Sequence, residues 1–287
     1  MKKITIIAGI VLFNPEISRL KKNISTITNQ VEKIVLFDNG SSNIEEIKEV
    51  ALGNSKLILI QSKKNIGIAA ALNRIFFYSK KNFQADFILT VDQDSVCPKN
   101  LICEYLKFYD LKIGIYTPEI TDINVLNNNE SKKKNNLETS EVKRCITSAS
   151  LTSYDAWKSV NGFDETMFID NVDFDFCKRI RKKGYKIVKV NSVSIKHEIG
   201  HITVHNTIFG RVLVKNHNSF RKYYIARNTI YMARKDCNIF WEVIAYLRVA
   251  KQILLVIMFE KNKAQKIKSL FKGTYEGKKI KIEKKWC

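Results

Sequence analysis

The sequence lacks three features that would each assign the chain to a protein class at once. It has no uninterrupted apolar run of about 18 residues or more, so we expect no membrane-spanning helix. Its six cysteines include no CxxC pair, which argues against a disulfide framework and against a thiolate zinc site. No internal repeat is visible. These absences favour free thiols in a reducing compartment, and we expect a cytoplasmic protein.

Acidic residues are scarce relative to basic ones. The 287 residues include 49 Lys and Arg but only 28 Asp and Glu, which gives a net charge of +21. Such an excess favours polyanionic partners, namely phosphates, nucleic acid or an anionic membrane face. A hydrophobic content of 45% indicates a globular protein with a real core. Charge alone therefore keeps a nucleic-acid-binding protein as an alternative.

Apolar strands alternate with helical patterns over the first hundred residues. The N-terminal MKKITIIAGIVLFNP has the charge of a signal peptide, but it lacks a small-residue cleavage site and is rich in β-branched residues. We therefore predict a first strand there. Further strands are predicted at KIVLFD, KLILIQS and FILTVD, with helices at 17–30, 44–51 and 67–78. This order predicts an α/β fold with a parallel sheet, whose ligands bind beyond the carboxyl ends of the strands.

Carboxylates follow two of these strands. Asp38 ends KIVLFD, and Asp92 and Asp94 follow the last predicted strand as VDQD. In extended backbone an i, i+2 pair points to one side, and hard oxygen ligands suit Mg²⁺ or Mn²⁺ with substrate phosphates completing the shell. A solvated turn, with the aspartates bonded to their own backbone, is the alternative.

A glycine opens the alanine-rich helix in NIGIAAALN. Asn65 and Gly67 stand where a helix N-terminus would favour an anion and where glycine would let the backbone approach it. An ordinary helix start, with small residues packed on the sheet, explains the pattern equally well.

A third cluster of carboxylates lies in NGFDETMFIDNVDFDFCKRIRKKGY. We predict a helix from near Asp170 to Gly184. Capping of its first turn explains Asp170 best and is the alternative for Asp173 and Asp175. Asp173 lies one turn before Cys177 on a partly apolar face, and such a carboxylate near a cleft can act as a general base. Asp175 should face another way and tolerate substitution.

The segment HEIGH, from His197 to His201, matches the zinc metalloprotease motif. That chemistry needs both histidines on one helix face. The surrounding residues are β-branched and Gly200 interrupts the motif, so we predict a strand, in which the two histidines stand roughly 13 Å apart. A zinc protease is kept only as a remote alternative.

The C-terminal part offers fewer signals. Residues 121–144 are polar and predict an exposed loop or loose hairpin. Arg221–Lys235 interleaves basic and aromatic residues, which we interpret as a helix. A second helix is predicted from Asn238 to Phe259, either packed on the core or lying on a membrane surface. The lysine-rich segment that follows is either a solvated tail or a tether to anionic lipid.

In order along the chain, these motifs resemble glycosyltransferase family 2, and especially its rhamnosyltransferase-like branch. They are Phe13-Asn14, FDNGSS, NIGIAAALN, VDQDS, NGFDETMFIDNVDFDFC, HEIG and YYIARN, and they span residues 4 to about 230. The resemblance implies a GT-A fold in residues 1–235, with a nucleotide-binding half (1–98) and an acceptor half (99–235). Residues 236–287 would form a helical, basic extension.

The resemblance also implies roles for single residues. Phe13, Asn14, Asp38, Asn65, Gly67 and Asp92 would bind the nucleotide sugar. Asp94 and His197 would hold Mg²⁺ or Mn²⁺ at the diphosphate, and Asp173 would be the catalytic base. Many family members carry Glu-Asp where this chain has Val172-Asp173, and the rhamnosyltransferase-like branch often shows that substitution.

The predicted function is therefore an inverting glycosyltransferase. The resemblance favours L-rhamnose from dTDP-rhamnose as the donor and a lipid-linked surface polysaccharide intermediate as the acceptor. A hexosyltransferase that uses a UDP-sugar is the alternative. The sequence leaves open whether the protein contacts the inner face of the cell membrane peripherally, and we expect no nucleic-acid partner.

Overall fold

The computed structural model describes residues 3–122, 137–197, 203–207 and 210–286. The chain divides into two compact units. The first comprises Met1–Thr166 and Asp173–His197, and the second comprises Met167–Val172 and Glu198–Cys287. The short segment Met167–Val172 therefore belongs to the second unit although both of its flanks belong to the first. The functional division proposed at residues 98 and 235 stays a prediction.

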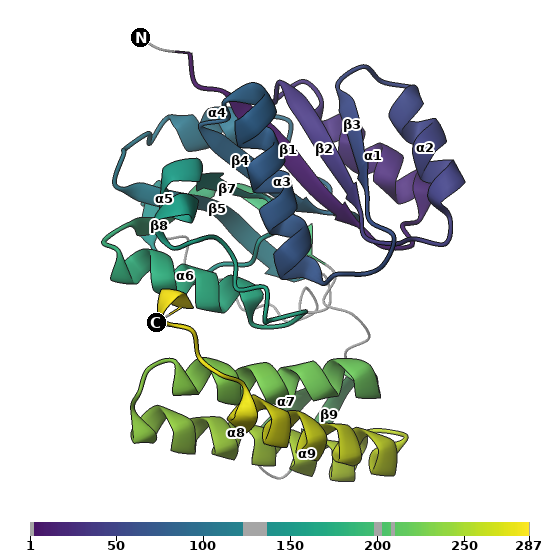
Figure 1. Ribbon diagram of the computed structural model, residues 1–287, viewed down its shortest axis with the longest axis vertical. Helices are drawn as coiled ribbons and strands as arrows, with labels where there is room; N and C mark the ends of the chain where they lie inside the picture. Colours follow the sequence, from purple (N-terminus) through teal and green to yellow (C-terminus); the bar gives the residue numbers. More distant parts are fainter. Residues whose placement is uncertain (1–2, 123–136, 198–202, 208–209, 287) are drawn as a thin grey trace. The chain divides into compact units, whose positions relative to one another are not determined.

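A mixed, mostly parallel sheet forms the first unit (Figure 1). Its eight strands in the described part of the chain are ordered β3-β2-β1-β4-β7-β5-β8-β6. The neighbours β3, β2, β1 and β4 run parallel, as the alternating pattern predicts, and β7 is antiparallel to β4 and β5. The strands are β1 (Ile6–Leu12), β2 (Lys33–Asp38), β3 (Leu57–Gln61), β4 (Phe87–Asp92), β5 (Ile113–Asp122), β6 (Thr139–Glu141), β7 (Ser150–Ser153) and β8 (Lys186–His197).

Helices cover the sheet because successive strand residues point to opposite faces. One face carries Ile10 and Leu36, which join a core with Leu20 of α1 and Tyr105 of α4. On the other face α3 comes so close to β1 that a Cβ on Gly9 would lie 2.4 Å from Ile75. The helices are α1 (Ile17–Ile27), α2 (Ile44–Leu52), α3 (Ile68–Phe83), α4 (Leu101–Leu106), α5 (Tyr154–Ser159) and α6 (Val172–Lys182).

The second unit is mainly helical. It contains the hairpin β9 (Thr203–Thr207) and β10 (Gly210–Val214), followed by α7 (Ser219–Arg234), α8 (Ile239–Phe259), α9 (Lys263–Lys279) and the 3-10 helix η2 (Lys284–Trp286). Small residues let α9 lie directly against α7, since Cβ atoms on Gly273 and Gly277 would lie 2.2 and 2.4 Å from α7 carbonyl oxygens. The lysine-rich segment after Phe259 therefore folds largely as a packed helix.

Two predictions about the chain's architecture are confirmed. The fold is α/β with a C-terminal helical, basic extension, and Arg221–Lys235 lies almost entirely in α7. The five described cysteines are free. None of the helices in the described part of the chain combines the length and the apolarity that crossing a bilayer requires.

Two sequence motifs fall partly outside the described residues. His197 is the last residue of β8, so the first histidine of HEIGH lies in a strand rather than on a helix, as predicted. Residues 198–201 lie outside the description. Of the predicted loop 121–144, residues 123–136 are outside it, and Thr139–Glu141 pairs with β8 as the edge strand β6.

Candidate active site

The end of β1 separates two of the predicted site carboxylates. In the sheet register, Leu12 pairs with Asp38 of β2, and Val11 pairs with Asp92 of β4. The two aspartates therefore lie on either side of the last two residues of β1. Two interstrand spacings, or roughly 10 Å, separate them. Both stand at the carboxyl edge of the parallel strands, where α/β sheets bind ligands.

Asp38 and Asn14 organise the two loops that follow β1 and β2. Asp38 is buried, and its Oδ1 accepts a hydrogen bond from the Ser41 backbone at 3.1 Å. Asn14, with φ of 48°, accepts from the Ser42 backbone at 2.8 Å and donates its own N–H to Ser41 Oγ. The predicted Phe13-Asn14 and FDNGSS motifs thus form one hydrogen-bonded cluster, and Phe13 stays 46% exposed beside it.

The DQD segment differs from the extended pair that the sequence suggested. Asp92 ends β4, and the Ser95 N–H bonds to its carbonyl at 3.1 Å, which closes a turn through Gln93 and Asp94. The predicted extended pair is therefore wrong for Asp94, because the backbone turns through Gln93 and Asp94 instead of continuing as a strand. Asp92 is half-buried, whereas Asp94 is exposed in the turn.

Gln93, which the sequence reasoning missed, ties this turn to β1. Its Oε1 accepts from the Phe13 N–H at 2.9 Å, and its Nε2 donates to the Phe13 carbonyl at 3.4 Å. The amide thereby pairs with the backbone of Phe13 as a neighbouring strand would. A glutamine between two aspartates gives no sequence signal, since its partner lies 80 residues away.

Asn65 and Gly67 join the same group of loops. Asn39 Nδ2 donates to Asn65 Oδ1 at 3.0 Å, and the Gly67 N–H donates to that same oxygen at 2.9 Å. Gly67 has φ of 86° and precedes α3, a conformation that favours glycine. A Cβ on Gly40 would lie 2.9 Å from the Asn65 nitrogen, so the two loops touch through backbone atoms.

Asp173 lies in the first turn of α6 and is partly exposed. One of its oxygens accepts from the Phe174 N–H at 2.9 Å. It lines a small cavity together with Thr90 of β4, Phe163 and Cys177. The contact of Cys177 with Cys145, at 3.6 Å between the sulfur atoms, and the burial of Cys177 raise its pKa well above the usual range. That thiol therefore stays protonated beside the carboxylate.

Asp175 is not the position tolerant of substitution that its spacing from Asp173 suggested. Its carboxylate accepts from Arg179 Nε at 2.8 Å, and both side chains are buried. Arg179 also donates to the carbonyls of Val160 and Gly162 at 2.7 and 2.8 Å. The two side chains meet because one helix turn separates them on the inward face. Through the bonds of Arg179 to these carbonyls, the pair anchors the NGFDE loop to α6.

Asn73 of α3 holds the same loop from the opposite end. Its Nδ2 donates to the Phe163 carbonyl and to Glu165 Oε1, both at 2.9 Å. Its Oδ1 accepts from the Phe163 N–H at 2.8 Å and from Trp157 Nε1 at 3.2 Å. The amide is buried and uses both of its donors and its acceptor, so it positions the loop instead of binding a ligand.

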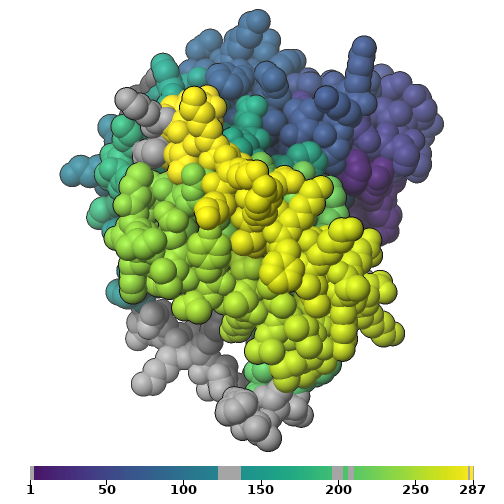
Figure 2. All heavy atoms as spheres, turned by 60° about the horizontal axis from the view of Figure 1, so that its bottom comes forward, coloured from purple at the N-terminus to yellow at the C-terminus, as the bar shows by residue number. Residues whose placement is uncertain are grey.

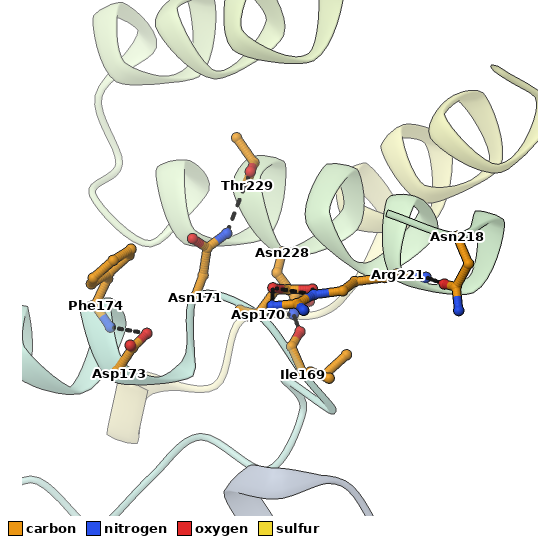
Figure 3. Close-up of polar contacts among 9 residues, drawn as sticks. All are labelled: Ile169, Asp170, Asn171, Asp173, Phe174, Asn218, Arg221, Asn228 and Thr229. Atoms are coloured by element: carbon orange, nitrogen blue, oxygen red, sulfur yellow. Dashed lines mark hydrogen bonds and ion pairs between the residues drawn. The ribbon is translucent and has the colours of Figure 1, made fainter. Parts of the chain in front are cut away.

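The residues just before α6 are held by α7 within the second unit (Figure 3). Asp170 and Asn171 both have positive φ, 64° and 63°. Arg221 donates to both oxygens of Asp170 at 2.9 to 3.1 Å, and Asn228 Nδ2 donates to the carbonyls of Ile169 and Asp170. The capping role predicted for Asp170 is wrong, because its left-handed backbone lies outside the helix and its carboxylate pairs with Arg221.

Metal ligation finds limited support in the side chains that the structure describes. Among them, no group of three or more His, Cys, Asp or Glu residues is arranged to hold a metal ion. The side chain of His197 lies outside the description. Asp94 offers an exposed carboxylate next to Asp92, so a cation at this edge would need oxygen ligands from a bound substrate.

A larger cavity, of about 350 Å³, lies at the opposite ends of β1 and β4. Its lining includes Lys80, Asp86, Tyr109 and Tyr154 and none of the predicted site residues. Lys80 stands 4.9 Å from the centre of the Tyr154 ring. Cavity size alone would therefore point away from the cluster of motif residues.

Three comparisons place this geometry among known proteins. The family model described as glycosyl transferase family 2 matches residues 8–177. Among curated proteins, the chain is 26% identical over 291 residues to the dTDP-rhamnosyl transferase RfbF of Shigella flexneri, with 95% of each chain covered.

Two solved structures show the same fold. The mannosyltransferase PcManGT from Pyrobaculum calidifontis, in complex with GDP-Man and Mn2+, is 13% identical with a TM-score of 0.58, covering 99% of this chain and 78% of that one. A crystal structure of GalNAc-T7 with UDP, GalNAc and Mn2+ is 14% identical with a TM-score of 0.56 over 69% of this chain. The chain spans 44% of the length of GalNAc-T7.

Proposed function

Because the chain belongs to glycosyl transferase family 2, we propose that it is an inverting transferase of L-rhamnose from dTDP-rhamnose. The acceptor would be a hydroxyl of a lipid-linked surface polysaccharide intermediate. Glycosyltransferase activity follows from the family, and the choice of donor draws on the similarity to RfbF over nearly the whole chain. The observation that carries the proposal is the arrangement of Asp38 and Asp92 on either side of the end of β1.

The donor would bind across the end of β1. Asp38 and Asn14 hold a loop whose backbone amides and exposed Phe13 ring can accommodate a base. Asp92 would contact the ribose, since it stands on the far side of β1 from Asp38. Asn65 and Gly67 would let the start of α3 approach the nucleotide, where a helix N-terminus favours negative charge.

A divalent cation at this edge would be held by few protein ligands and by oxygens of the substrate. Asp94 provides a hard, exposed carboxylate one residue beyond Gln93, and His197 is the second proposed ligand. Mg²⁺ and Mn²⁺ accept one or two protein carboxylates and complete their shell with phosphate oxygens. When bound, the cation would neutralise charge on the leaving diphosphate.

Asp173 would act on the acceptor. Its carboxylate would take the proton from the acceptor hydroxyl as that oxygen attacks the anomeric carbon. The bond to the diphosphate oxygen breaks on the opposite face, so a single displacement inverts the carbon, as in single-displacement glycosidases. The buried Asp175–Arg179 pair and Asn73 would keep the neighbouring NGFDE loop in place during this step.

A panel of nucleotide sugars tests the donor. We expect dTDP-rhamnose to raise the melting temperature most and to be hydrolysed slowly without acceptor, with turnover lost in excess EDTA. A preference for UDP-hexoses would overturn the rhamnose proposal and favour the hexosyltransferase alternative.

Full activity in EDTA would overturn the proposed role of Asp94. NMR of the product tests inversion: we expect the anomeric configuration of the transferred sugar to be opposite to that in the donor.

A further inference from the structure

Helix α8 is apolar on two opposite sides. Its inner side packs on the other helices of the second unit through Ala245, Val249 and Val256, all buried. A helix that is apolar all round normally lies inside a protein or a membrane. Here the outer side is exposed, although it carries the larger hydrophobic side chains.

The exposed apolar residues recur at helical spacing. Val243, Leu247 and Leu254 are 50%, 64% and 54% exposed, and they follow one another at i, i+4 and i+11 on a single face. Ile239, Phe240, Tyr246, Ile257 and Met258 extend this face to both ends of the helix. We call these eight residues the outer face of α8. With 21 residues the helix is about 31 Å long, so the face is an extended stripe.

The segment that carries the outer face is rich in cations. Residues 239–287 contain twelve Lys and Arg but only four Glu. Lys251 lies on α8 beside the stripe, and Lys261, Lys263, Lys268, Lys272, Lys278 and Lys279 are exposed on the following turn and on α9. Phe271 and Tyr275, 61% and 59% exposed, stand among the α9 lysines. Figure 2 shows α8 and α9 in light green to yellow at the surface.

We propose that the outer face of α8 binds an anionic lipid bilayer, lying in its interface with the lysines of α8 and α9 on the headgroups. Interfacial helices combine an apolar face with Lys, Arg and aromatic residues in this way. A second copy of the chain is the less favoured occupant. Two such faces would bring like charges together on chains of +21 each, whereas an anionic membrane complements that charge.

This binding mode needs no spanning helix and does not rest on the proposed function. Hydrophobic insertion and electrostatic attraction would act together, so neither alone would hold the chain firmly. The position of the lysines makes binding dependent on headgroup charge and on salt. A chain bound in this way would stand beside any substrate that is itself anchored in lipid.

Vesicle flotation with the full-length protein tests the proposal. We expect binding to vesicles of phosphatidylethanolamine and phosphatidylglycerol, and little to phosphatidylcholine alone. Each of Leu247→Gln and Leu254→Gln should weaken binding about tenfold, as expected for withdrawing one buried leucine from an apolar phase. Leu52→Gln is the matched control, since Leu52 is an 87% exposed leucine of α2 and should leave binding unchanged.

A fluorescence measurement places the face directly. Trp157 and Trp286 are buried, so in a Trp241→Phe background the substitution Leu254→Trp adds the one exposed tryptophan. Its emission should shift to the blue on anionic vesicles and return in about 1 M salt, where the Debye length falls to about 3 Å. Equal flotation of the wild type and both leucine variants would overturn the proposal. So would a dimer in solution that Leu254→Gln converts to monomer.

Discussion

The two compact units use their buried polar groups for different purposes. In the first unit, buried amides such as Asn39 and Asn73 bond to loops at the carboxyl edge of the sheet. In the second, Glu260 accepts from Lys222 at 2.6 Å and from Lys266 at 2.7 Å, and all three side chains are buried between helices. Polar burial therefore shapes a site in one unit and joins helices in the other.

The two units also differ in how fully their apolar side chains are covered. The sheet is covered on both faces, and its core continues from α1 through the strands to α4. The second unit has a small core, built on residues such as Ala226 and Leu270, and leaves the outer face of α8 exposed. The first unit therefore uses its helices to cover its sheet, whereas the second leaves a stripe of large apolar side chains exposed, which the proposed bilayer contact would cover.

The largest effect should come from the proposed base in the first unit. Asp173→Asn keeps the side-chain shape but cannot accept a proton at neutral pH. A positioned general base contributes about 10² to 10⁴ in rate, so we expect kcat to fall at least about a hundredfold with donor binding unchanged. Isothermal titration with the donor and initial rates separate the two effects.

Asp155→Asn is the control for that substitution, because Asp155 is an exposed acid in the first turn of α5. Asp175 is unsuitable as the control, because it forms a buried ion pair with Arg179. Its substitution could lower the rate through a loss of structure alone. Retention of most turnover by Asp173→Asn would place the base elsewhere.

In the second unit the largest effect should follow the loss of Glu260. Burial alone would raise the pKa of this carboxyl, but the bonds from Lys222 and Lys266 outweigh burial and hold its pKa below the usual value. Glu260→Gln would leave two buried lysines without a counter-charge, and breaking a buried pair costs about 3 to 5 kcal/mol. Urea unfolding measures the loss.

The matched control makes the same change on the surface. Glu45 accepts from Lys48 at 2.7 Å, but its side chain is 78% exposed. Glu45→Gln should change the free energy of unfolding by no more than about 0.5 kcal/mol. Equal losses for the two variants would show that burial of the Glu260 cluster is unimportant.

Asn73→Ala asks how far the site depends on its supporting amide. The substitution leaves the Phe163 backbone and Trp157 Nε1 without their partner, and an unsatisfied buried group costs about 1 to 3 kcal/mol. We expect lower stability and a lower kcat, both measured on the same preparation. Asn82→Ala, on the exposed side of α3, should change neither.

The order of strands and helices in the first unit could be predicted from the sequence, because the period of apolar residues switches cleanly between strand and helix. The position of Asp38 and Asp92 followed from that order. The roles of Gln93 and Asn73 could not, since their partners lie 80 and 90 residues away. The turn at Asp94 is tied to β1 by Gln93, and the left-handed backbone of Asp170 is tied to α7 by Arg221, and no local pattern records these distant bonds.

The second unit was less predictable for a different reason. Ten lysines follow Phe259, and that composition resembles a solvated tail. The helix α9 forms there because Gly273 and Gly277 fit against α7 and because Glu260 neutralises Lys266. Neither cause is visible without the fold.

Gly273→Ala tests that close packing. A Cβ at this position would lie 2.2 Å from the Tyr223 carbonyl oxygen, so the two helices must separate. Overpacking of this kind costs about 1 to 3 kcal/mol, and we expect about 2 in urea unfolding. Gly53→Ala is the control, because its nearest atom would lie at 3.6 Å and its stability should be unchanged or slightly raised. Equal behaviour would show that α7 and α9 pack loosely.

The smallest effect concerns pH and His217, just before α7. Burial, followed by the charges of Arg221, Lys222 and Lys215, lowers the pKa of His217 to about 4, although Glu260 acts in the opposite direction. The ring is therefore neutral in the folded chain, and it takes up a proton near its ordinary pKa of 6.5 only on unfolding. The resulting stabilisation is complete above pH 6.5 and is lost as the pH falls toward 4. Because the ring is partly exposed, we expect only about 1 kcal/mol across that window.

His217→Gln removes the titrating group. The free energy of unfolding of the wild type minus that of the variant, measured in urea, should therefore decrease as the pH is lowered from 7 to 5. A constant difference would show that His217 titrates alike in both states, and that the cations around it leave its proton affinity unchanged.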